Sequence, residues 1–175
     1  MNSIATFVES KDSTSILEGA IASVEAVFQT SAPLVVKRAL FDKACWLVSE
    51  RHGKYKTRYR TSDSSSAPTE LLRHDHVIPR AHLWIVARTT MTVSEALRLC
   101  EGCLVTEEEH KRLHDIDDAY GWERYVKAGI QVIDTSTGKI VPADLLLDLS
   151  KGFKQAYRDS RFVSDGEEEL AKMQE

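Results

Sequence analysis

Cysteine is scarce in this chain of 175 residues, which contains only three, at positions 45, 100 and 103. A set that small and odd in number cannot form the disulfide framework of a small secreted domain, so the sequence favours a reducing compartment. Long apolar runs are missing as well, and the first residues lack the cationic start and apolar stretch of a signal peptide. We therefore expect a cytoplasmic protein without a membrane-spanning segment.

A strong net charge is also lacking, since the formal charge is −4 and 42% of the residues are hydrophobic. The length and this composition fit one folded domain with a real core. The charge is nevertheless uneven. Residues 51–90 hold eight Lys and Arg against three Asp and Glu, whereas residues 101–125 hold three against eight. A basic stretch of this kind can contact a polyanion even in an acidic protein.

Apolar residues at three- and four-residue spacing predict two helices near the N-terminus. The first extends from Thr14 to Gln29, and the second begins near Pro33 and ends before His52. We expect the two helices to pair as a hairpin that forms the first part of the chain, residues 1–53. Cys45 and Trp46 are expected in its core.

Residues 54–60 alternate cationic side chains with Tyr or Thr. Because side chains alternate between faces along a strand, a strand here would carry its cations on one side and its tyrosines on the other. The basic side is a candidate for binding the phosphates of a nucleic-acid duplex. The alternative is a solvated strand whose tyrosines face the core. With one further arginine, the predicted nucleic-acid-binding residues are Lys54, Lys56, Arg58, Arg60 and Arg80.

Four of the six histidines lie at the two ends of the stretch 71–115. At one end, His74, Asp75 and His76 belong to a predicted short strand that turns at a proline. At the other end, Thr106 is a strong N-cap candidate, and a glutamate three residues later completes a capping box. A helix is therefore predicted to begin at Glu107.

On such a helix, His110 and His114 lie one turn apart on the same side, so both imidazoles can bind one cation. Neutral imidazole suits Zn²⁺ and other first-row metals, and the carboxylate of Asp75 extends the range toward Mg²⁺ or Mn²⁺. His76 would project from the opposite face of an ideal strand, and a twist or bulge at the strand end would turn it toward the same centre.

A site of this composition suits the hydrolysis of a phosphodiester bond. That reaction needs a cation to neutralise the charge that grows on the phosphate and the leaving oxygen. It also needs a base that takes a proton from water at neutral pH, which a histidine near its ordinary pKa can do.

The sequence Asp-His-Val-Ile-Pro at residues 75–79, and Leu-Val-Thr followed by Glu109, His110 and His114, resemble the motifs of the HNH or ββα-metal endonucleases. The likeness includes the two-histidine version found in nuclease colicins, and residues 121–125 are similar to sequence that follows such domains. The resemblance implies a metal-dependent DNA endonuclease. Its general base would be His76, and its divalent cation, Mg²⁺, Mn²⁺, Ni²⁺ or Zn²⁺, would be held by Asp75, His110 and His114. His74 is an alternative to Asp75.

The implied fold is α+β, a mainly helical domain with a ββα-metal core formed by a short hairpin and a helix. The core would occupy residues 54–118. A C-terminal extension of helix and hairpin with an acidic tail would follow at residues 119–175. The connection between the two halves of the motif is longer than in compact members of the family, and we expect it to hold an extra helix.

The family's middle asparagine should lie nine residues before His110, where this chain has Glu101, and its only asparagine is Asn2. Glu101 is therefore a candidate catalytic residue that either makes a similar backbone hydrogen bond or joins the metal ligands. A degenerate domain without activity is the third reading.

Two other functions remain open. One is a structural zinc site in a nucleic-acid-binding module, held by Cys100, Cys103, His110 and His114. The other is a catalytically inactive binding protein with the HNH fold. DNA is the expected partner and no membrane is expected. RNA stays open because a phosphodiester site does not identify the sugar. The sequence also leaves room for a protein partner or inhibitor, and it does not predict the oligomeric state.

Overall fold

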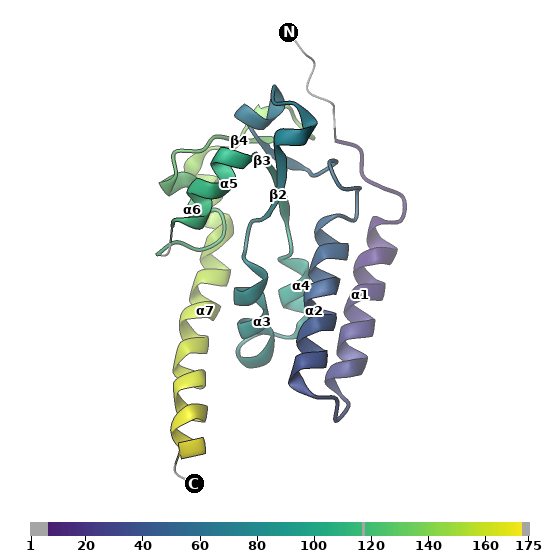
Figure 1. Cartoon of the computed structure of the whole chain (residues 1–175), viewed down its shortest axis with the longest axis vertical. Coiled ribbons are helices and arrows are strands. Elements are labelled where there is room, and N and C mark those ends of the chain that lie inside the picture. The colour runs from purple at the N-terminus through teal and green to yellow at the C-terminus, as the bar shows by residue number, and fades with distance from the viewer. Residues whose placement is uncertain (1–6, 117, 173–175) are drawn as a thin grey trace.

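The computed structural model describes residues 7–116 and 118–172. Over these residues the protein is α+β, as predicted, with seven α-helices and one five-stranded mixed sheet (Figure 1). The helices are α1 Ser13–Phe28, α2 Leu34–Ser49, α3 Arg80–Thr89, α4 Val93–Arg98, α5 Glu107–His114, α6 Glu123–Lys127 and α7 Ala143–Lys172. The strands are β1 Tyr59–Thr61, β2 Leu72–His76, β3 Gly102–Thr106, β4 Val132–Asp134 and β5 Lys139–Ile140, and the short 3-10 helices Asp63–Ser65 and Thr69–Leu71 lie between β1 and β2.

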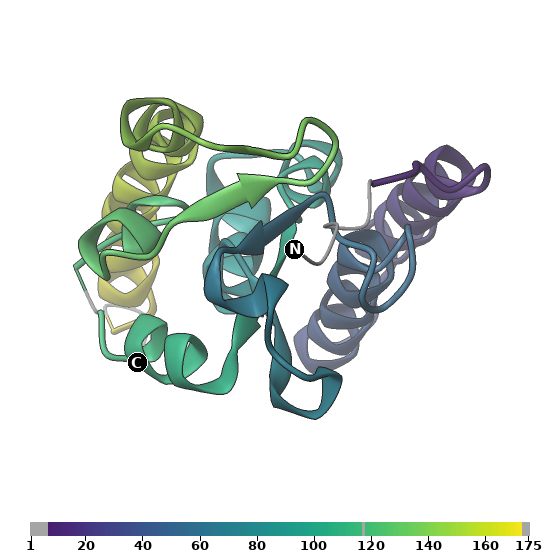
Figure 2. The same ribbon diagram turned by 90° about the horizontal axis from the view of Figure 1, so that it is seen from above.

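The sheet has the strand order β2-β3-β1-β4-β5. Only the β1–β3 pair is parallel, and the other neighbours are antiparallel. β2 and β3 pair along their full length, from Leu72 opposite Thr106 to His76 opposite Gly102. In the view from above, the sheet lies between α7 on one side and the α1–α2 hairpin on the other (Figure 2).

The predicted N-terminal hairpin is confirmed, because α1 and α2 pack side by side. Their apolar stripes meet α3, α4 and α7 in the larger of two cores. The largest fully buried side chains of this core are Phe41, Leu83, Leu97 and Phe153. Since these come from four different helices, the N-terminal hairpin and the C-terminal helix are tied to the same apolar cluster.

The smaller core lies between the sheet, α5, α6 and the first turn of α7. Val105 and Val132 contribute from the sheet, Leu113 from α5 and Tyr125 from α6, and each is at most 1% exposed. This cluster fixes α5 and α6 against β3. It therefore determines where the side chains of these two short helices lie.

Some local predictions were wrong. The strand expected at residues 54–60 begins only at Tyr59, because that is where the chain gains hydrogen-bonded neighbours on both sides, β3 and β4. The predicted hairpin of β2 and β3 is not short, because residues 77–101 join the two strands.

This long connection holds α3 and α4, so the expected extra helix is confirmed. The β4–β5 hairpin is followed by α7, a helix of 30 residues. The acidic side chains predicted for the C-terminal tail lie outside the described residues. No helix among the described residues combines the length and apolarity needed to cross a membrane.

Candidate active site

β2, β3 and α5 form a strand-strand-helix unit, since α5 starts directly where β3 ends. The predicted capping box is confirmed. The Thr106 hydroxyl accepts from the Glu109 main-chain N–H at 3.2 Å, and Glu109 Oε2 accepts from the Thr106 N–H at 2.8 Å. Glu109 is buried, and its Oε2 also accepts from the Thr61 hydroxyl at 2.6 Å. The first turn of α5 is thereby anchored to β1, which fixes the helix that carries the two predicted ligand histidines.

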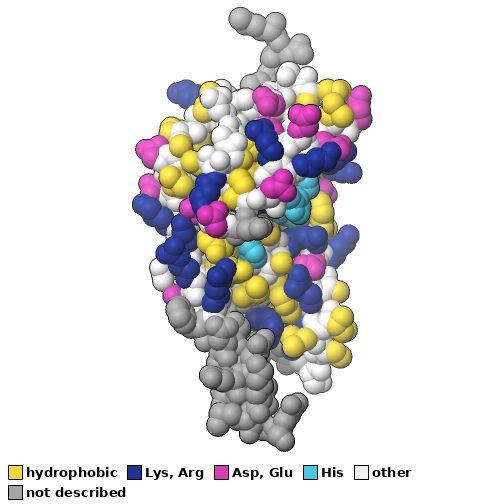
Figure 3. Space-filling view, turned by 60° about the vertical axis from the view of Figure 1, so that its left-hand side comes forward, with side chains coloured by type: hydrophobic (Ala, Val, Ile, Leu, Met, Phe, Trp, Pro, Cys, Tyr) yellow, Lys and Arg dark blue, Asp and Glu magenta, His cyan; other side chains and the backbone are white. Residues whose placement is uncertain are grey.

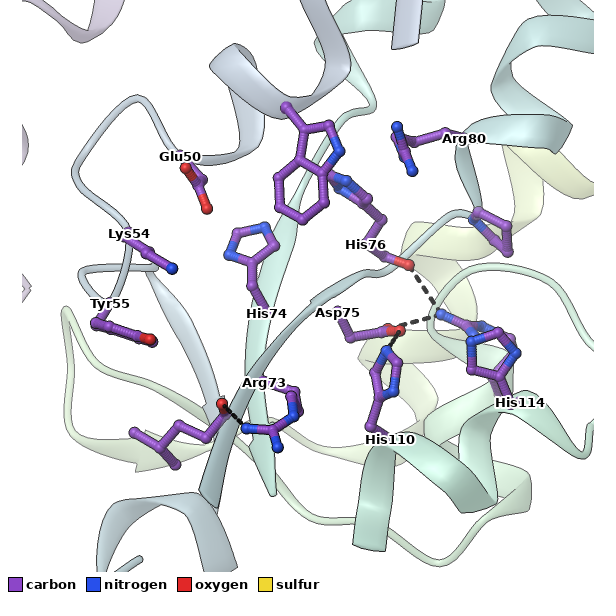
Figure 4. A pocket seen from close by; sticks show the side chains of 14 residues that line it. Glu50, Lys54, Tyr55, Arg73, His74, Asp75, His76, Arg80, His110 and His114 are labelled. Atoms are coloured by element: carbon purple, nitrogen blue, oxygen red, sulfur yellow. Dashed lines mark hydrogen bonds and ion pairs between the residues drawn. The ribbon is translucent and has the colours of Figure 1, made fainter. Parts of the chain in front are cut away.

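A pocket of about 540 Å³ opens beside this unit (Figure 4). It is lined by Asp75 and His76 from β2 and by His110 and His114 from α5. Four of the five residues predicted for catalysis or metal binding therefore lie around one pocket, although 33 residues separate the two pairs in the sequence. In the space-filling view, exposed histidine side chains lie among Lys, Arg and acidic side chains (Figure 3).

Asp75 and His110 lie close enough to share a cation. The distance from Asp75 Oδ1 to His110 Nε2 is 3.8 Å. Two atoms that each bind one metal at roughly 2.1 Å can be at most about 4.2 Å apart, so this distance is within the limit. The His110 and His114 rings lie 5.1 Å apart between centroids. Burial lowers the pKa of His110, against the opposing effect of Asp75, and so favours the neutral imidazole that metals bind.

The third predicted ligand, His114, is not gathered with Asp75 and His110 closely enough for all three to bind one ion. Within residues 7–116 and 118–172, no three His, Cys, Asp or Glu side chains are gathered closely enough to hold a metal ion. His114 is exposed on the last turn of α5, so a rotamer change can move its ring without disturbing the core. A carboxylate and two imidazoles are a donor set that suits a first-row divalent metal, and the residues present therefore fit such an ion.

The other oxygen of Asp75 is bound by two residues that the sequence did not single out. Asp75 Oδ2 accepts from Arg124 Nη2 at 2.7 Å and from the Tyr125 hydroxyl at 2.6 Å. Asp75, Arg124 and Tyr125 are all at most 5% exposed. Both donors come from α6, and the sequence predicted no role for either of them.

His76 faces away from Asp75. The β2–β3 pairing is continuous, so no bulge turns the two neighbours to one side, and that expectation was wrong. The His76 ring instead packs edge-on against Trp46 at 4.6 Å, and the Arg80 guanidinium lies 5.2 Å above the same indole. Trp46 is thus half-buried in the pocket wall, where the sequence had predicted a core residue.

Neither ring nitrogen of His76 has a hydrogen-bond partner among the described residues. Burial, with help from His74, Arg80 and Arg124, lowers the pKa of His76 to about 3. The imidazole is therefore neutral at pH 7, and in this buried position it is a weaker base than an ordinary histidine. His74 lies on the same face of β2, 5.3 Å from His76, and burial lowers its pKa as well. His74 is therefore on the wrong side of the strand to replace Asp75.

Glu101 lies outside the pocket, so its assignment to the catalytic set is corrected. Its carboxylate is 3.6 Å from the Arg51 guanidinium, and burial raises its pKa. The main chain of Glu101 does brace the loop after β2, since its carbonyl accepts from the Val77 N–H at 3.0 Å. Any residue at this position can make that bond, so the family's asparagine has no side-chain counterpart here.

The predicted basic face is also corrected. Lys54 and Arg80 line the site pocket, but Arg58 is paired with Asp134 at 2.8 Å. Lys56 and Arg60 line a neighbouring pocket of about 400 Å³, and the exposed Tyr55 borders both pockets. The cations diverge because residues 54–58 are not a strand, so their side chains do not alternate between two faces.

The cysteines lie in different cores. Cys100 packs in the larger core together with Cys45, and Cys103 packs in the smaller one. The neighbouring Cys45 thiol together with burial raises the pKa of the Cys100 thiol, and burial raises that of Cys103. Over the described part of the chain, Cys100, Cys103, His110 and His114 are not gathered as a zinc site would require.

The chain matches no family model, and no curated protein or solved structure shows significant similarity to it.

Proposed function

We propose that the chain is a metal-dependent endonuclease of the ββα-metal (HNH) class that hydrolyses phosphodiester bonds in DNA. The observation that carries the proposal is the approach of Asp75 Oδ1 to His110 Nε2, 3.8 Å apart, in a pocket that His76 and His114 also line. The order of the elements supports it, since two antiparallel strands and the helix that follows them supply all four residues.

Asp75, His110 and His114 would hold the divalent cation. The bound ion would supply positive charge to the phosphate and the leaving oxygen. His76, which lines the same pocket from the other face of β2, would act as the general base and take a proton from the attacking water. Burial holds its pKa at about 3, so the ring is a weak base until substrate entry exposes one of its nitrogens to water.

The substrate-binding cations would be those that border the site pocket. Lys54, Arg73 and Arg80 line it, and Arg73 is held by an ion pair with Glu107 at the start of α5. The neighbouring pocket with Lys56 and Arg60 extends the basic surface past Tyr55. A nucleic-acid strand that follows this surface would meet cations on both sides of the proposed metal.

A binding protein without activity is the second candidate. The burial of His76 favours this candidate, since both ring nitrogens are buried beside Trp46. In an active enzyme, substrate entry must expose one of these nitrogens to water. In an inactive relative, His76 would remain a packing residue.

Incubation with supercoiled plasmid DNA and Mg²⁺, Mn²⁺, Ni²⁺ or Zn²⁺ separates the two candidates. The endonuclease nicks or linearises the plasmid with at least one metal, and His76→Ala and Asp75→Ala do not. His82→Phe is the matched control, because His82 lies outside the pocket and stacks on Tyr157, which a phenyl ring can also do. Binding of DNA without cleavage under every metal would establish the second candidate. Parallel reactions with single-stranded DNA and RNA identify the substrate.

A further inference from the structure

The terminal nitrogen Nη2 of Arg124 lies inside a cage of three oxygens. These are Asp75 Oδ2 at 2.7 Å and the main-chain carbonyl oxygens of His76 at 2.9 Å and Val77 at 3.0 Å. A guanidinium nitrogen of this kind carries two hydrogens, so it cannot make three separate linear hydrogen bonds. All three oxygens attract positive charge. The cage is therefore a place for a cation within the buried end of β2.

The two oxygens of Asp75 have different surroundings. Oδ2 accepts from Arg124 and from Tyr125, whereas Oδ1 accepts no hydrogen bond from the described residues and faces His110. Asp75 is 4% exposed. A buried carboxylate without a counter-charge is strongly unfavourable, and Arg124 supplies the missing charge.

We propose, on the basis of the proposed function, that Arg124 is a built-in counter-cation that competes with the divalent metal for Asp75. It keeps the carboxylate paired when no metal is bound, and it weakens the binding of a metal to Oδ1. Repulsion between a guanidinium and a divalent ion on one carboxylate remains strong even at an effective dielectric constant of about 20.

This arrangement also determines which metals bind best. Because Oδ2 of Asp75 is already bonded to Arg124 and Tyr125, the affinity for a metal depends mainly on the imidazoles of His110 and His114. Imidazole favours Zn²⁺, Ni²⁺ or Co²⁺ over Mg²⁺, which prefers oxygen ligands. We therefore expect the wild type to bind Zn²⁺ more tightly than Mg²⁺ by a wide margin.

Arg124→Met tests the inference, because it removes the charge and retains a side chain of similar reach while Tyr125 still holds Oδ2. In calorimetric titrations, the Kd for Zn²⁺ and for Mn²⁺ should fall by about tenfold or more as the repulsion is lost. In the presence of a chelator, the Tm of the variant should fall by about 5 °C or more. Added metal should restore that loss, so the rise in Tm on metal binding exceeds the rise of the wild type.

Tyr125→Phe is the matched control. It removes an uncharged hydrogen-bond donor from the same oxygen and leaves the charge of Arg124 in place, so the Kd should change by less than about threefold. Arg124→Lys keeps the charge and supplies three donors to the three oxygens, so its metal affinity should stay near that of the wild type.

A purely structural role for Arg124 predicts another pattern: the Tm of Arg124→Met would fall equally with and without metal, and the Kd would not decrease. That result overturns the inference. If Arg124→Met does not fold in the chelator, folding on addition of Zn²⁺ supports it. Failure to fold at saturating Zn²⁺ overturns it.

The wild type separates this inference from the proposed function. A wild type that binds no divalent cation and cuts no DNA contradicts both. A wild type that binds metal and cuts DNA, with an Arg124→Met variant that gains no affinity, contradicts only the role given to Arg124.

Discussion

Gly102 lies directly against the imidazole ring of His74. A β-carbon built at Gly102 would stand 2.4 Å from His74 Cε1 and 3.2 Å from the Ser49 carbonyl oxygen. Real β-carbons essentially never make the first contact, so the His74 ring would have to move, and the Ser49 carbonyl oxygen would have to give by a few tenths of an ångström. The absence of a side chain at position 102 therefore allows β2, β3 and the end of α2 to approach one another at the pocket wall.

Gly102→Ala should consequently destabilise the protein. The added methyl must displace His74, which packs beside His76 and Trp46, and overpacking of this kind costs about 1–3 kcal/mol. Denaturant unfolding measures the loss. The control is Gly19→Ala in α1, where a β-carbon would meet nothing within 4 Å. That change should stabilise the helix by about 0.5–1 kcal/mol. Equal stability of Gly102→Ala and the wild type would disprove the close approach.

Two capping boxes in the described part of the chain allow a second comparison. Glu95 caps the exposed start of α4, whereas Glu109 caps α5 and is buried with the Thr61 hydroxyl on its carboxylate. Glu95→Ala should cost about 1 kcal/mol or less, which is the loss of a cap. Glu109→Ala should cost about 2–4 kcal/mol, because it also leaves a buried hydroxyl without its acceptor. Urea denaturation of both variants checks the ranking, and a smaller loss for Glu109→Ala would contradict it.

His82 should make the protein less stable in mild acid. Burial lowers its pKa, and Arg124 and Arg161 lower it further, while Tyr120 and Tyr157 pack against the ring. Because the folded-state pKa lies below the unfolded value of about 6.5, the unfolded chain binds more protons between the two values. The contribution of His82 to the free energy of unfolding is therefore fully present above the unfolded pKa of about 6.5, and it is lost as the pH falls below that pKa.

His82→Phe removes this contribution, so the free energy of unfolding should fall less steeply with acid than in the wild type. Thermal unfolding at pH 7.5, 6.5 and 5.5 measures the slope. His114→Gln serves as a control at an exposed position outside the cores. An unchanged slope in His82→Phe would show that the ring does not contribute.

Arg80 should contribute to nucleic-acid binding, and Arg88 on the same helix should not. Arg80 lines the site pocket, whereas Arg88 is exposed and lies over Trp84, outside that pocket. Arg80→Ala should weaken DNA binding and reduce the slope of log K against log salt by about one. Fluorescence anisotropy across a salt series is the measurement. Equal losses for Arg80→Ala and Arg88→Ala would argue for a diffuse charge effect.

Local signals in the sequence predicted much of the scaffold. Apolar spacing located α1 and α2 to within a residue or two, and the Thr106 capping box placed the start of α5 at Glu107. These features depend on neighbours along the chain. The alternating charges at residues 54–60 predicted a strand that begins too early. A strand forms only where other strands pair with it, and this pairing begins at Tyr59.

The surroundings of the site depended on contacts that no local pattern encodes. Arg124 reaches Asp75 across 49 positions of sequence, and Trp46 reaches His76 across 30. The motifs identified the residues around the pocket. The partner of each was decided by how α2 and α6 pack on the sheet, so the pairing of Asp75 and the coverage of His76 became visible only in three dimensions.

Anomalous X-ray diffraction from crystals soaked in Zn²⁺ tests the shared cation most directly. Our account predicts one peak within about 2–2.5 Å of both Asp75 Oδ1 and His110 Nε2, with the ring of His114 turned toward it. A peak at Cys100 and Cys103 instead, or no peak near Asp75 at saturating zinc, would contradict it.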